Sequence, residues 1–269
     1  MTIVITGATS GIGLAAGKLL AQRGHDVALV GRTEQSAEAA AQAVRAGAPA
    51  ADVSWFAADL AHRHQVENLA RTLNVAHPSL RGLVLCAGVS NPRQSTTNGI
   101  DTTLAVNHLA PVLLSTLLDA NLAGGRIVLL TSSQHGAAGP FDPAVFEVGA
   151  PTSAIRRYEA TKLLNLLWAA ARLDHPHMAP MEVIDPGFVR TGLGRNATGA
   201  LRVLLTLTRP LQAAPQVPAR LIADRLAAAD FTDGAYRGRK GVATKAANAL
   251  DPAAAKQAWA WTTDLLARC

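Results

Sequence analysis

The sequence is poor in cysteine, aromatic residues and long apolar runs. Its 269 residues include only two cysteines, Cys86 and Cys269, which excludes a disulfide framework and a cysteine-based metal cluster. The longest apolar stretch, 163–171, falls far short of the roughly 18 residues that a membrane span requires, so a transmembrane protein is excluded. Because no basic region precedes the first apolar segment, we expect no signal peptide and a cytoplasmic location.

Lysine is also scarce. Five lysines and 20 arginines stand against 19 acidic residues, which gives a net charge of +6. These positive charges are scattered without a basic run or interleaved aromatics, so we expect no nucleic-acid binding. Among the eight histidines, the close pairs His62/His64 and His175/His177 are only two residues apart, so we expect no metal site either. The composition favours a soluble enzyme with a small-molecule substrate.

The chain does contain a regular alternation of β-branched apolar segments and longer alanine- and leucine-rich segments. This rhythm is typical of βαβ units around a parallel sheet. It predicts an α/β fold, a single-domain doubly wound parallel sheet (Rossmann-like) with helices on both faces, over residues 1–269. A substrate lid is predicted around 188–217. The predicted strands are 2–6, 27–30, 53–57, 82–85, 126–131 and 181–184, with helices beginning near residues 10, 36, 62, 101 and 152.

A glycine-rich turn directly follows the first predicted strand and opens a helix. Gly7 allows a sharp turn, Gly11 lets the backbone approach a pyrophosphate, and Gly13 permits close helix packing. The helix N-terminus adds amide donors and the positive end of the helix dipole. The alternative is a purely structural turn. The pattern predicts a dinucleotide site that includes Gly7, Thr9, Ser10, Gly11, Ile12 and Gly13.

The residues after the second and third strands bear on the choice of cofactor. The second strand ends without the carboxylate that NAD-preferring folds place there, and Arg32 follows instead. A guanidinium can pair with a 2′-phosphate, so we predict NADP(H) in preference to NAD(H), the alternative being a solvated surface arginine. Asp59 and Leu60 are candidate adenine contacts, although Asp59 is equally suited to cap the next helix.

Further motifs follow in a fixed order: Ala87-Gly88, Asn107, Thr131-Ser132-Ser133, Tyr158-x-x-x-Lys162 and Asp185-Pro186-Gly187. Together with the glycine turn they resemble the short-chain dehydrogenase/reductase superfamily over roughly 2–191. The segments 106–109, 132–136 and 162–166 are most similar to its retinol dehydrogenase and WW-domain oxidoreductase branch. The chain departs from the common pattern at Cys86, where the family usually has asparagine, and at Thr161, where serine is usual. The resemblance implies homodimers or homotetramers.

The chemistry can be argued from the residues. Transfer of a hydride to a carbonyl carbon requires a proton for the oxygen, and Tyr158 is a suitable donor if its pKa is lowered towards neutrality. Lys162, four residues on and on the same helical face, supplies a cation that would lower that pKa. The resemblance implies that Ser133, rather than Ser132, hydrogen-bonds the substrate oxygen and the Tyr158 hydroxyl. It also implies that Asn107 holds a water in a proton relay to the lysine.

The resemblance extends to the cofactor contacts near the nicotinamide, which are Ala87, Gly88, Asn107, Tyr158, Lys162, Pro186, Gly187, Val189 and Thr191. His135, two residues after Ser133, either reaches this site or is an ordinary loop histidine. The leucine-rich stretch 201–211 could line an apolar pocket, lie on a membrane surface or form an oligomer contact, and we expect a lipophilic carbonyl or alcohol substrate. The alternative function is a catalytically silent NADP(H)-binding sensor or scaffold.

Overall fold

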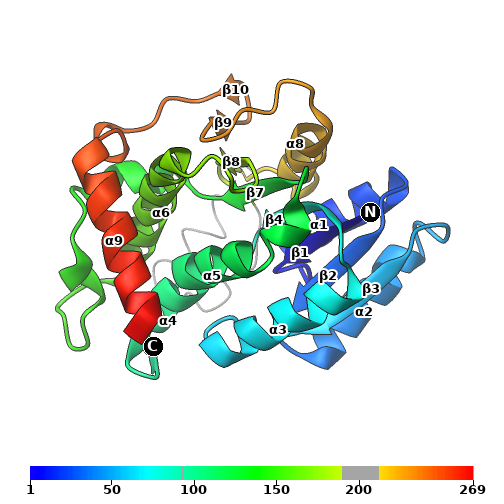
Figure 1. The fold of residues 1–269 in the computed structure, drawn as a ribbon, viewed down its shortest axis with the longest axis horizontal. Coiled ribbons are helices and arrows are strands. Elements are labelled where there is room, and N and C mark those ends of the chain that lie inside the picture. The colour runs from blue at the N-terminus through cyan, green and yellow to red at the C-terminus, as the bar shows by residue number, and fades with distance from the viewer. Residues whose placement is uncertain (92–93, 190–211, 269) are drawn as a thin grey trace.

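The computed structural model describes residues 1–91, 94–189 and 212–268. An eight-stranded sheet lies at its centre, in the order β10-β9-β8-β7-β4-β1-β2-β3 (Figure 1). All neighbouring pairs are parallel except β9 and β10. The strands are β1 (Thr2–Thr6), β2 (Val27–Gly31), β3 (Val53–Ala57), β4 (Leu80–Leu85), β7 (Arg126–Leu130), β8 (Met181–Ile184), β9 (Tyr236–Gly238) and β10 (Gly241–Val242); a separate hairpin pairs β5 (Thr96–Thr97) with β6 (Ile100–Asp101).

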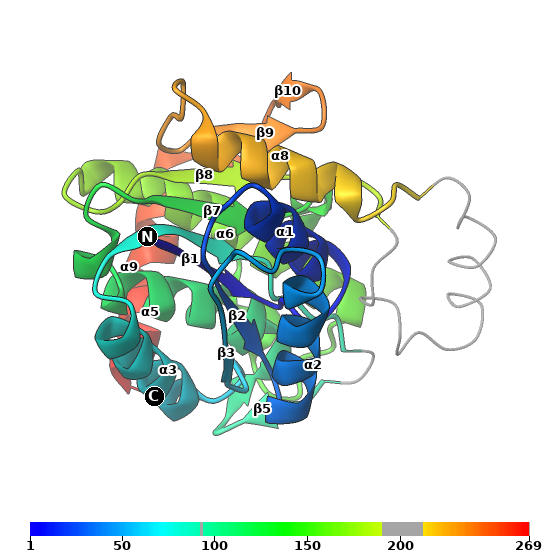
Figure 2. The ribbon, with the colours of Figure 1, turned by 90° about the vertical axis from the view of Figure 1, so that its right-hand side faces the viewer.

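Helices cover both faces of the sheet (Figure 2). On one face α1 (Gly11–Gln22) packs between α2 (Glu34–Arg45) and α8 (Gln216–Ala227). On the other lie α3 (Arg63–Ala76), α5 (Ala110–Leu117) and α6 (Ala154–Ala171), with α9 (Pro252–Arg268) packed against α6. The short helices are α4 (Thr102–Leu104), a π-helix (Ala105–Leu109) and 3₁₀ turns at Ala120–Leu122, Ser133–Ala138, Pro143–Phe146, Arg172–Asp174 and Ala247–Ala249.

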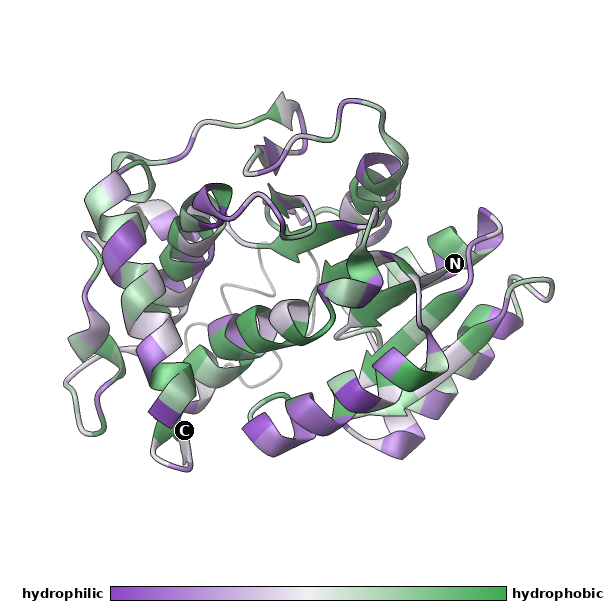
Figure 3. Ribbon diagram, in the orientation of Figure 1, coloured by the Kyte–Doolittle hydropathy of each residue, from purple (hydrophilic) through white to green (hydrophobic). Residues whose placement is uncertain are grey.

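Two apolar clusters, one on each face, form the core. The strands contribute nearly continuous buried runs such as Ile3, Val4 and Ile5, as expected for parallel strands covered on both faces. Figure 3 shows the same division, with hydrophobic strands inside and hydrophilic residues on the outer sides of α2 and α3. Among the described helices, none is both long and apolar enough to cross a bilayer.

The observed architecture confirms the predicted fold class and all six predicted strands. Several boundaries differ: β2 includes Gly31, β4 begins at Leu80, and β7 ends at Leu130, although the Thr131 N–H still donates to the Ile184 carbonyl at 2.9 Å. Strands β9 and β10 were not predicted, since three- and two-residue strands rich in glycine and charge carry no apolar periodicity. Most of the predicted lid lies outside the described residues, including the whole of 201–211.

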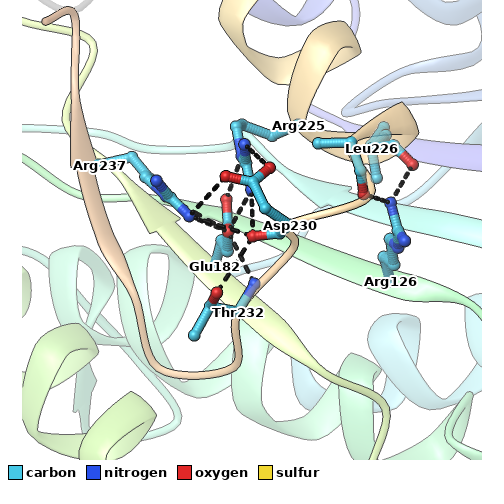
Figure 4. A network of polar contacts seen from close by, with 8 residues as sticks. Arg126, Glu182, Arg225, Leu226, Asp230, Thr232 and Arg237 are labelled. Atoms are coloured by element: carbon cyan, nitrogen blue, oxygen red, sulfur yellow. Dashed lines mark hydrogen bonds and ion pairs between the residues drawn. The ribbon is translucent and has the colours of Figure 1, made fainter. Parts of the chain in front are cut away.

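A buried ionic network joins strands β8 and β9 to α8 (Figure 4). The fully buried carboxylate of Glu182 on β8 accepts two hydrogen bonds from Arg225, Nε to Oε2 at 2.7 Å and Nη2 to Oε1 at 2.8 Å. Arg237 Nη2 on β9 and the backbone N–H of Thr232 each reach Oε1 at 3.0 Å. The network fixes α8 and β9 against β8.

Candidate active site

The turn between β1 and α1 is too crowded to accept side chains at two of its glycines. Gly7 has φ +65°, and a Cβ there would lie 2.8 Å from the Ala87 Cα. A Cβ on Gly13 would lie 2.4 Å from the Gly7 carbonyl oxygen. The backbone N–H of Ala87 donates to Thr6 Oγ1 at 3.3 Å, so the ends of β1 and β4 are held together. The glycines therefore leave bare backbone at the carboxyl edge of the central strands.

The start of α1 is suited to an anion. Ser10 is the N-cap residue, but its side chain makes no capping hydrogen bond, and no acidic residue occupies the first turn. The amide donors and the positive dipole end of this helix are thus not neutralised by the helix's own side chains. Thr9 lies against the end of β2, where a Cβ on Gly31 would meet its Cγ2 at 2.5 Å. This side-chain-free cradle fits a pyrophosphate.

Arg32 directly follows β2 beside this cradle. Its side chain is exposed and makes no ion pair within the part of the chain that the structure describes. Thr33 begins α2 with a capping box, accepting from the Ser36 N–H at 3.3 Å, and so fixes the backbone on one side of Arg32. An unpaired guanidinium at this position fits a phosphate group on the ribose.

Asp59 shapes the turn after β3 without capping the next helix. Its Oδ1 accepts from the Ala61 N–H at 3.0 Å, and its own N–H donates to Gln65 Oε1 at 2.8 Å. The N-cap residue of α3 is His62, so the capping role considered for Asp59 does not occur. The Ala58 N–H donates to the Gly31 carbonyl at 2.8 Å, which holds Asp59 and the partly buried Leu60 beside the cradle.

Tyr158 and Lys162 lie on α6, facing the end of β7. Ser153 begins this helix by accepting from the Arg156 N–H at 3.1 Å. Lys162 Nζ lies 5.3 Å from the centre of the Tyr158 ring and donates to the Leu130 carbonyl at 3.3 Å. Thr131 Oγ1 donates to the Lys162 carbonyl at 3.0 Å. These contacts place the tyrosine and the lysine together at the carboxyl edge of the sheet.

Of the two adjacent serines, Ser132 is the one whose hydroxyl lowers the pKa of Tyr158, and the assignment of the catalytic role to Ser133 stays a prediction. Ser132 has extended backbone (φ −160°, ψ 149°) and caps the 3₁₀ helix that follows, its Oγ accepting from the Gln134 N–H at 3.3 Å. Ser133 is the first residue of a 3₁₀ helix and is exposed. The chain turns directly after Ser132, so Ser132 is the serine at the end of the extended segment.

The pKa values of Tyr158, Lys162 and Cys86 are all shifted chiefly by burial. Burial raises the pKa of Tyr158 to about 12, the Ser132 hydroxyl opposes this rise, and the negative charge of Asp185 adds to it. Burial lowers the pKa of Lys162 to about 8, with Cys86 and Asp185 acting in the opposite direction. The lowered pKa expected for Tyr158 is not found, because desolvation of the phenolate dominates, and the effect of Lys162 on this pKa stays a prediction. Burial likewise raises the pKa of the Cys86 thiol to about 12.

Asn107 lies in the π-helix and joins three segments of the site. Its Oδ1 accepts from the Val89 N–H at 2.7 Å, and its Nδ2 donates to the Val89 carbonyl at 2.9 Å and to Thr161 Oγ1 at 3.2 Å. A Cβ on Gly88 would lie 3.6 Å from Asn107 Oδ1 and 3.9 Å from Lys162 Nζ, so both polar groups flank this glycine. The structure therefore brings Asn107, Gly88 and Lys162 together.

The segment after β8 forms another side of the site. Asp185 Oδ1 accepts from the Gly187 N–H at 2.9 Å, and Oδ2 accepts from the Tyr236 hydroxyl at 3.3 Å. Gly187, which follows Pro186, has φ +71°, a conformation that favours glycine. Val189 forms a single bridge with Ala213, while Thr191 lies outside the described residues. Sequence reasoning missed Asp185 as a charge near Tyr158 and Lys162; its place next to the Pro-Gly pair was the available signal.

His135 is a buried part of the framework around Ser132. Its Nε2 accepts from the Ala246 N–H at 3.1 Å, so Nδ1 must carry the proton that is donated to the Ser132 carbonyl at 2.8 Å. The ring also packs edge-on against Tyr236, with the two ring centres 5.4 Å apart. The His135 ring therefore supports the backbone of the loop that carries Ser132, and a role of His135 in the site itself stays a prediction.

Known proteins share this arrangement of sequence and fold. A family profile described as short chain dehydrogenase matches residues 1–146. A protein of Streptomyces sp. (strain C5) provisionally named daunorubicin C-13 ketoreductase DnrU is 37% identical over 203 residues, which cover 74% of this chain and 69% of the relative. Human dehydrogenase/reductase SDR family member 13 is 34% identical over 218 residues, 78% of this chain but only 56% of the relative. The chain thus spans little more than half of the latter's length.

Solved structures agree with the sequence matches. A short chain dehydrogenase from Burkholderia cenocepacia J2315 in complex with NADP superposes with a TM-score of 0.67 at 25% identity, over 88% of this chain and 94% of the other. A short-chain dehydrogenase from Sphingobium yanoikuyae in complex with NADPH gives a TM-score of 0.65 at 24% identity, over 84% of each chain. Both neighbours bind a phosphorylated nicotinamide cofactor on this fold.

Proposed function

The chain belongs to the short-chain dehydrogenase/reductase superfamily, and we propose that it is an NADP(H)-dependent oxidoreductase acting on a carbonyl or alcohol. One observation carries this proposal: Tyr158 and Lys162 lie together on α6 at the carboxyl edge of the sheet, with Lys162 Nζ 5.3 Å from the centre of the tyrosine ring. A binding-only protein has no chemical need for this set. Such a protein, a silent sensor or scaffold, is the alternative that the experiments below distinguish.

Several features of the chain support the proposed cofactor site. The turn Gly7–Gly13 would hold the pyrophosphate, with Arg32 at a 2′-phosphate and with Asp59 and Leu60 near the adenine. Ala87, Gly88 and Asn107 would border the ribose and nicotinamide, Lys162 would hold the ribose hydroxyls, and Pro186, Gly187, Val189 and Thr191 would close the site. The bound cofactor supplies or accepts the hydride.

In the proposed reaction, the protein handles the proton. When a carbonyl is reduced, the Tyr158 hydroxyl gives its proton to the substrate oxygen, and in alcohol oxidation it takes that proton back. Ser132 orients the oxygen with its hydroxyl, in the role that the sequence analysis assigned to Ser133. With a pKa of about 8, the Lys162 amine can exchange a proton near neutral pH and so restore the Tyr158 proton.

The substrate proposed here is a small lipophilic ketone, aldehyde or alcohol. The name of the Streptomyces relative, a ketoreductase, supports a ketone. The single-domain organisation, the homodimer or homotetramer and the cytoplasmic location expected from the sequence remain predictions.

The function can be tested in two steps. Purified protein is titrated with NADPH and with NADH by fluorescence, and cofactor absorbance is then followed with aldehydes, ketones including daunorubicin, and lipophilic alcohols. We expect tight NADPH binding and turnover of at least one carbonyl compound. NADPH binding without turnover across the panel would favour the sensor or scaffold, and no binding of either cofactor would contradict the cofactor site.

Changing Arg32 to aspartate should shift the cofactor preference. A carboxylate at this position repels a 2′-phosphate and accepts from ribose hydroxyls, so we expect NADPH affinity to fall about tenfold or more while NADH affinity rises. The Kd values from fluorescence titration measure this. Arg81→Asp is the matched control, because Arg81 is an exposed arginine near the opposite, amino-terminal end of β4. An unchanged ratio of the NADPH and NADH Kd values in Arg32→Asp would show that Arg32 does not contact the 2′-phosphate.

The two neighbouring serines can be separated by a paired substitution. Because Ser132 is the serine that acts on the pKa of Tyr158 and Ser133 is exposed, Ser132→Ala should lower kcat by about 10²-fold or more, whereas Ser133→Ala should stay within about threefold of wild type. Steady-state kinetics with any substrate found in the panel measures both. The reverse order of effects would restore the assignment to Ser133.

A further inference from the structure

A chain of buried polar side chains continues from Asn107 into the apolar interior. His108 in the π-helix, Asn165 on α6 and Thr262 on α9 are between 0% and 2% exposed. His108 Nδ1 lies 3.0 Å from Asn165 Oδ1, and Nε2 lies 2.9 Å from Thr262 Oγ1. Asn165 Nδ2 reaches the Asn107 carbonyl at 3.1 Å. The row thus connects α9 to Asn107, which lies with Lys162 beside Gly88.

The donors and acceptors in this row of side chains fix the direction of each hydrogen bond. A backbone carbonyl can only accept, so Asn165 Nδ2 donates to Asn107 and Asn165 Oδ1 faces the histidine. The His108 nitrogen next to that oxygen, Nδ1, must then carry a proton. Burial lowers the pKa of His108 to about 4, so the ring is neutral near pH 7 and Nε2 is left to accept from the Thr262 hydroxyl.

Packing alone does not require these polar groups. Trp168 lies edge-on to His108, with the two ring centres 6.4 Å apart, and apolar side chains such as Leu104 and Leu166 are fully buried in the same cluster. An apolar side chain at position 108 would fill a similar volume without the cost of burying a polar ring. The polar chain instead provides a donor for the Asn107 carbonyl in a π-helix, where the regular i to i−4 hydrogen bonds are interrupted.

We propose that Thr262, His108 and Asn165 act as positioning residues, holding the Asn107 carbonyl so that the Asn107 side chain stays aligned beside Lys162. This inference rests on the proposed function, because it assigns these residues to proton handling at Tyr158. Asn107 carries the effect onward through Thr161 Oγ1 and Val89, the former on the residue directly before Lys162. The C-terminal helix is thereby coupled to the reacting end of the protein.

The first test removes the Thr262 hydroxyl, the donor at the α9 end of this row of polar side chains. Thr262→Val keeps the side-chain shape but deletes the hydroxyl bonded to Nε2, and we expect kcat to fall about tenfold with the NADPH Kd unchanged. Thr262→Ser restores a hydroxyl and should recover most of kcat. Ser115→Ala is the control, since Ser115 is equally buried but donates only to the Val112 carbonyl within α5. It should leave kcat within about twofold of wild type.

A second readout does not depend on turnover. In ¹⁵N NMR spectra of the full chain at pH 7, His108 should be neutral with its proton on Nδ1, and Thr262→Val should perturb the Nε2 resonance first. A proton on Nε2 in the wild type would overturn the inference. So would an unchanged kcat in Thr262→Val while the wild type is active. A wild type that binds NADPH but turns over no substrate in the panel would instead overturn the proposed function.

Discussion

Replacing Tyr158 by phenylalanine should lower kcat by about 10²- to 10⁴-fold while leaving the NADPH Kd within about threefold of wild type. The hydroxyl is the only group of this side chain that can exchange a proton with a substrate oxygen, and the ring itself is retained. Steady-state kinetics and fluorescence titration of the same preparation measure the two quantities. Substantial residual turnover would contradict the assignment of Tyr158 as the acid and base.

The chain offers a matched comparison, because Tyr236 is its only other tyrosine. Tyr236 is also buried, and its hydroxyl donates to Asp185 Oδ2 at 3.3 Å. Tyr236→Phe removes the same atom from the same residue type, so it controls for the general effect of losing a buried hydroxyl. We expect a much smaller fall in kcat than in Tyr158→Phe. Equal losses in the two variants would mean that the effect is structural.

Replacing Glu182 by alanine should lower the free energy of unfolding by about 3–5 kcal/mol. The substitution leaves the guanidinium groups of Arg225 and Arg237, which are 11% and 10% exposed, without the buried carboxylate that they share, although the 73% exposed Asp230 still pairs with both. It also leaves the Thr232 N–H without its acceptor. Urea denaturation followed by circular dichroism measures the change. The urea concentration at the midpoint of unfolding should fall, while the slope of the unfolding free energy against urea concentration stays similar.

A surface ion pair provides the control for Glu182. Arg268 and Asp264 on α9 lie 2.7 Å apart, but their side chains are 63% and 62% exposed. Asp264→Ala should therefore change the free energy of unfolding by no more than about 0.5 kcal/mol. A loss below about 1 kcal/mol in Glu182→Ala would show that the buried network does not stabilise the sheet, since burial is what distinguishes the two pairs.

The sequence was sufficient for the six longer strands of the sheet because these strands are covered on both faces. Runs such as Ile3-Val4-Ile5 are apolar without interruption, and turn residues separate them from helices of clear period. The glycine turn and the Tyr158/Lys162 pair could be predicted for a similar reason, since both depend on spacing within one segment. Features of this kind are encoded locally and need no knowledge of the rest of the chain.

Features that depend on distant contacts could not be predicted. The choice between Ser132 and Ser133 depends on which residue begins a 3₁₀ turn, and the two are adjacent and chemically identical. The raised pKa of Tyr158 depends on how deeply α6 is buried. His108 and Thr262 are 154 residues apart, and neither belongs to a recognisable motif with the other.

The position of Glu182 in the chain has a consequence for folding during synthesis. Its two cationic partners lie 43 and 55 residues later, so a nascent chain that has just completed β8 holds a carboxylate destined for the core with no cation to meet it. Desolvating that charge is unfavourable until α8 and β9 have emerged. We therefore expect β8 to join the sheet late, only when the ribosome has delivered the last third of the protein.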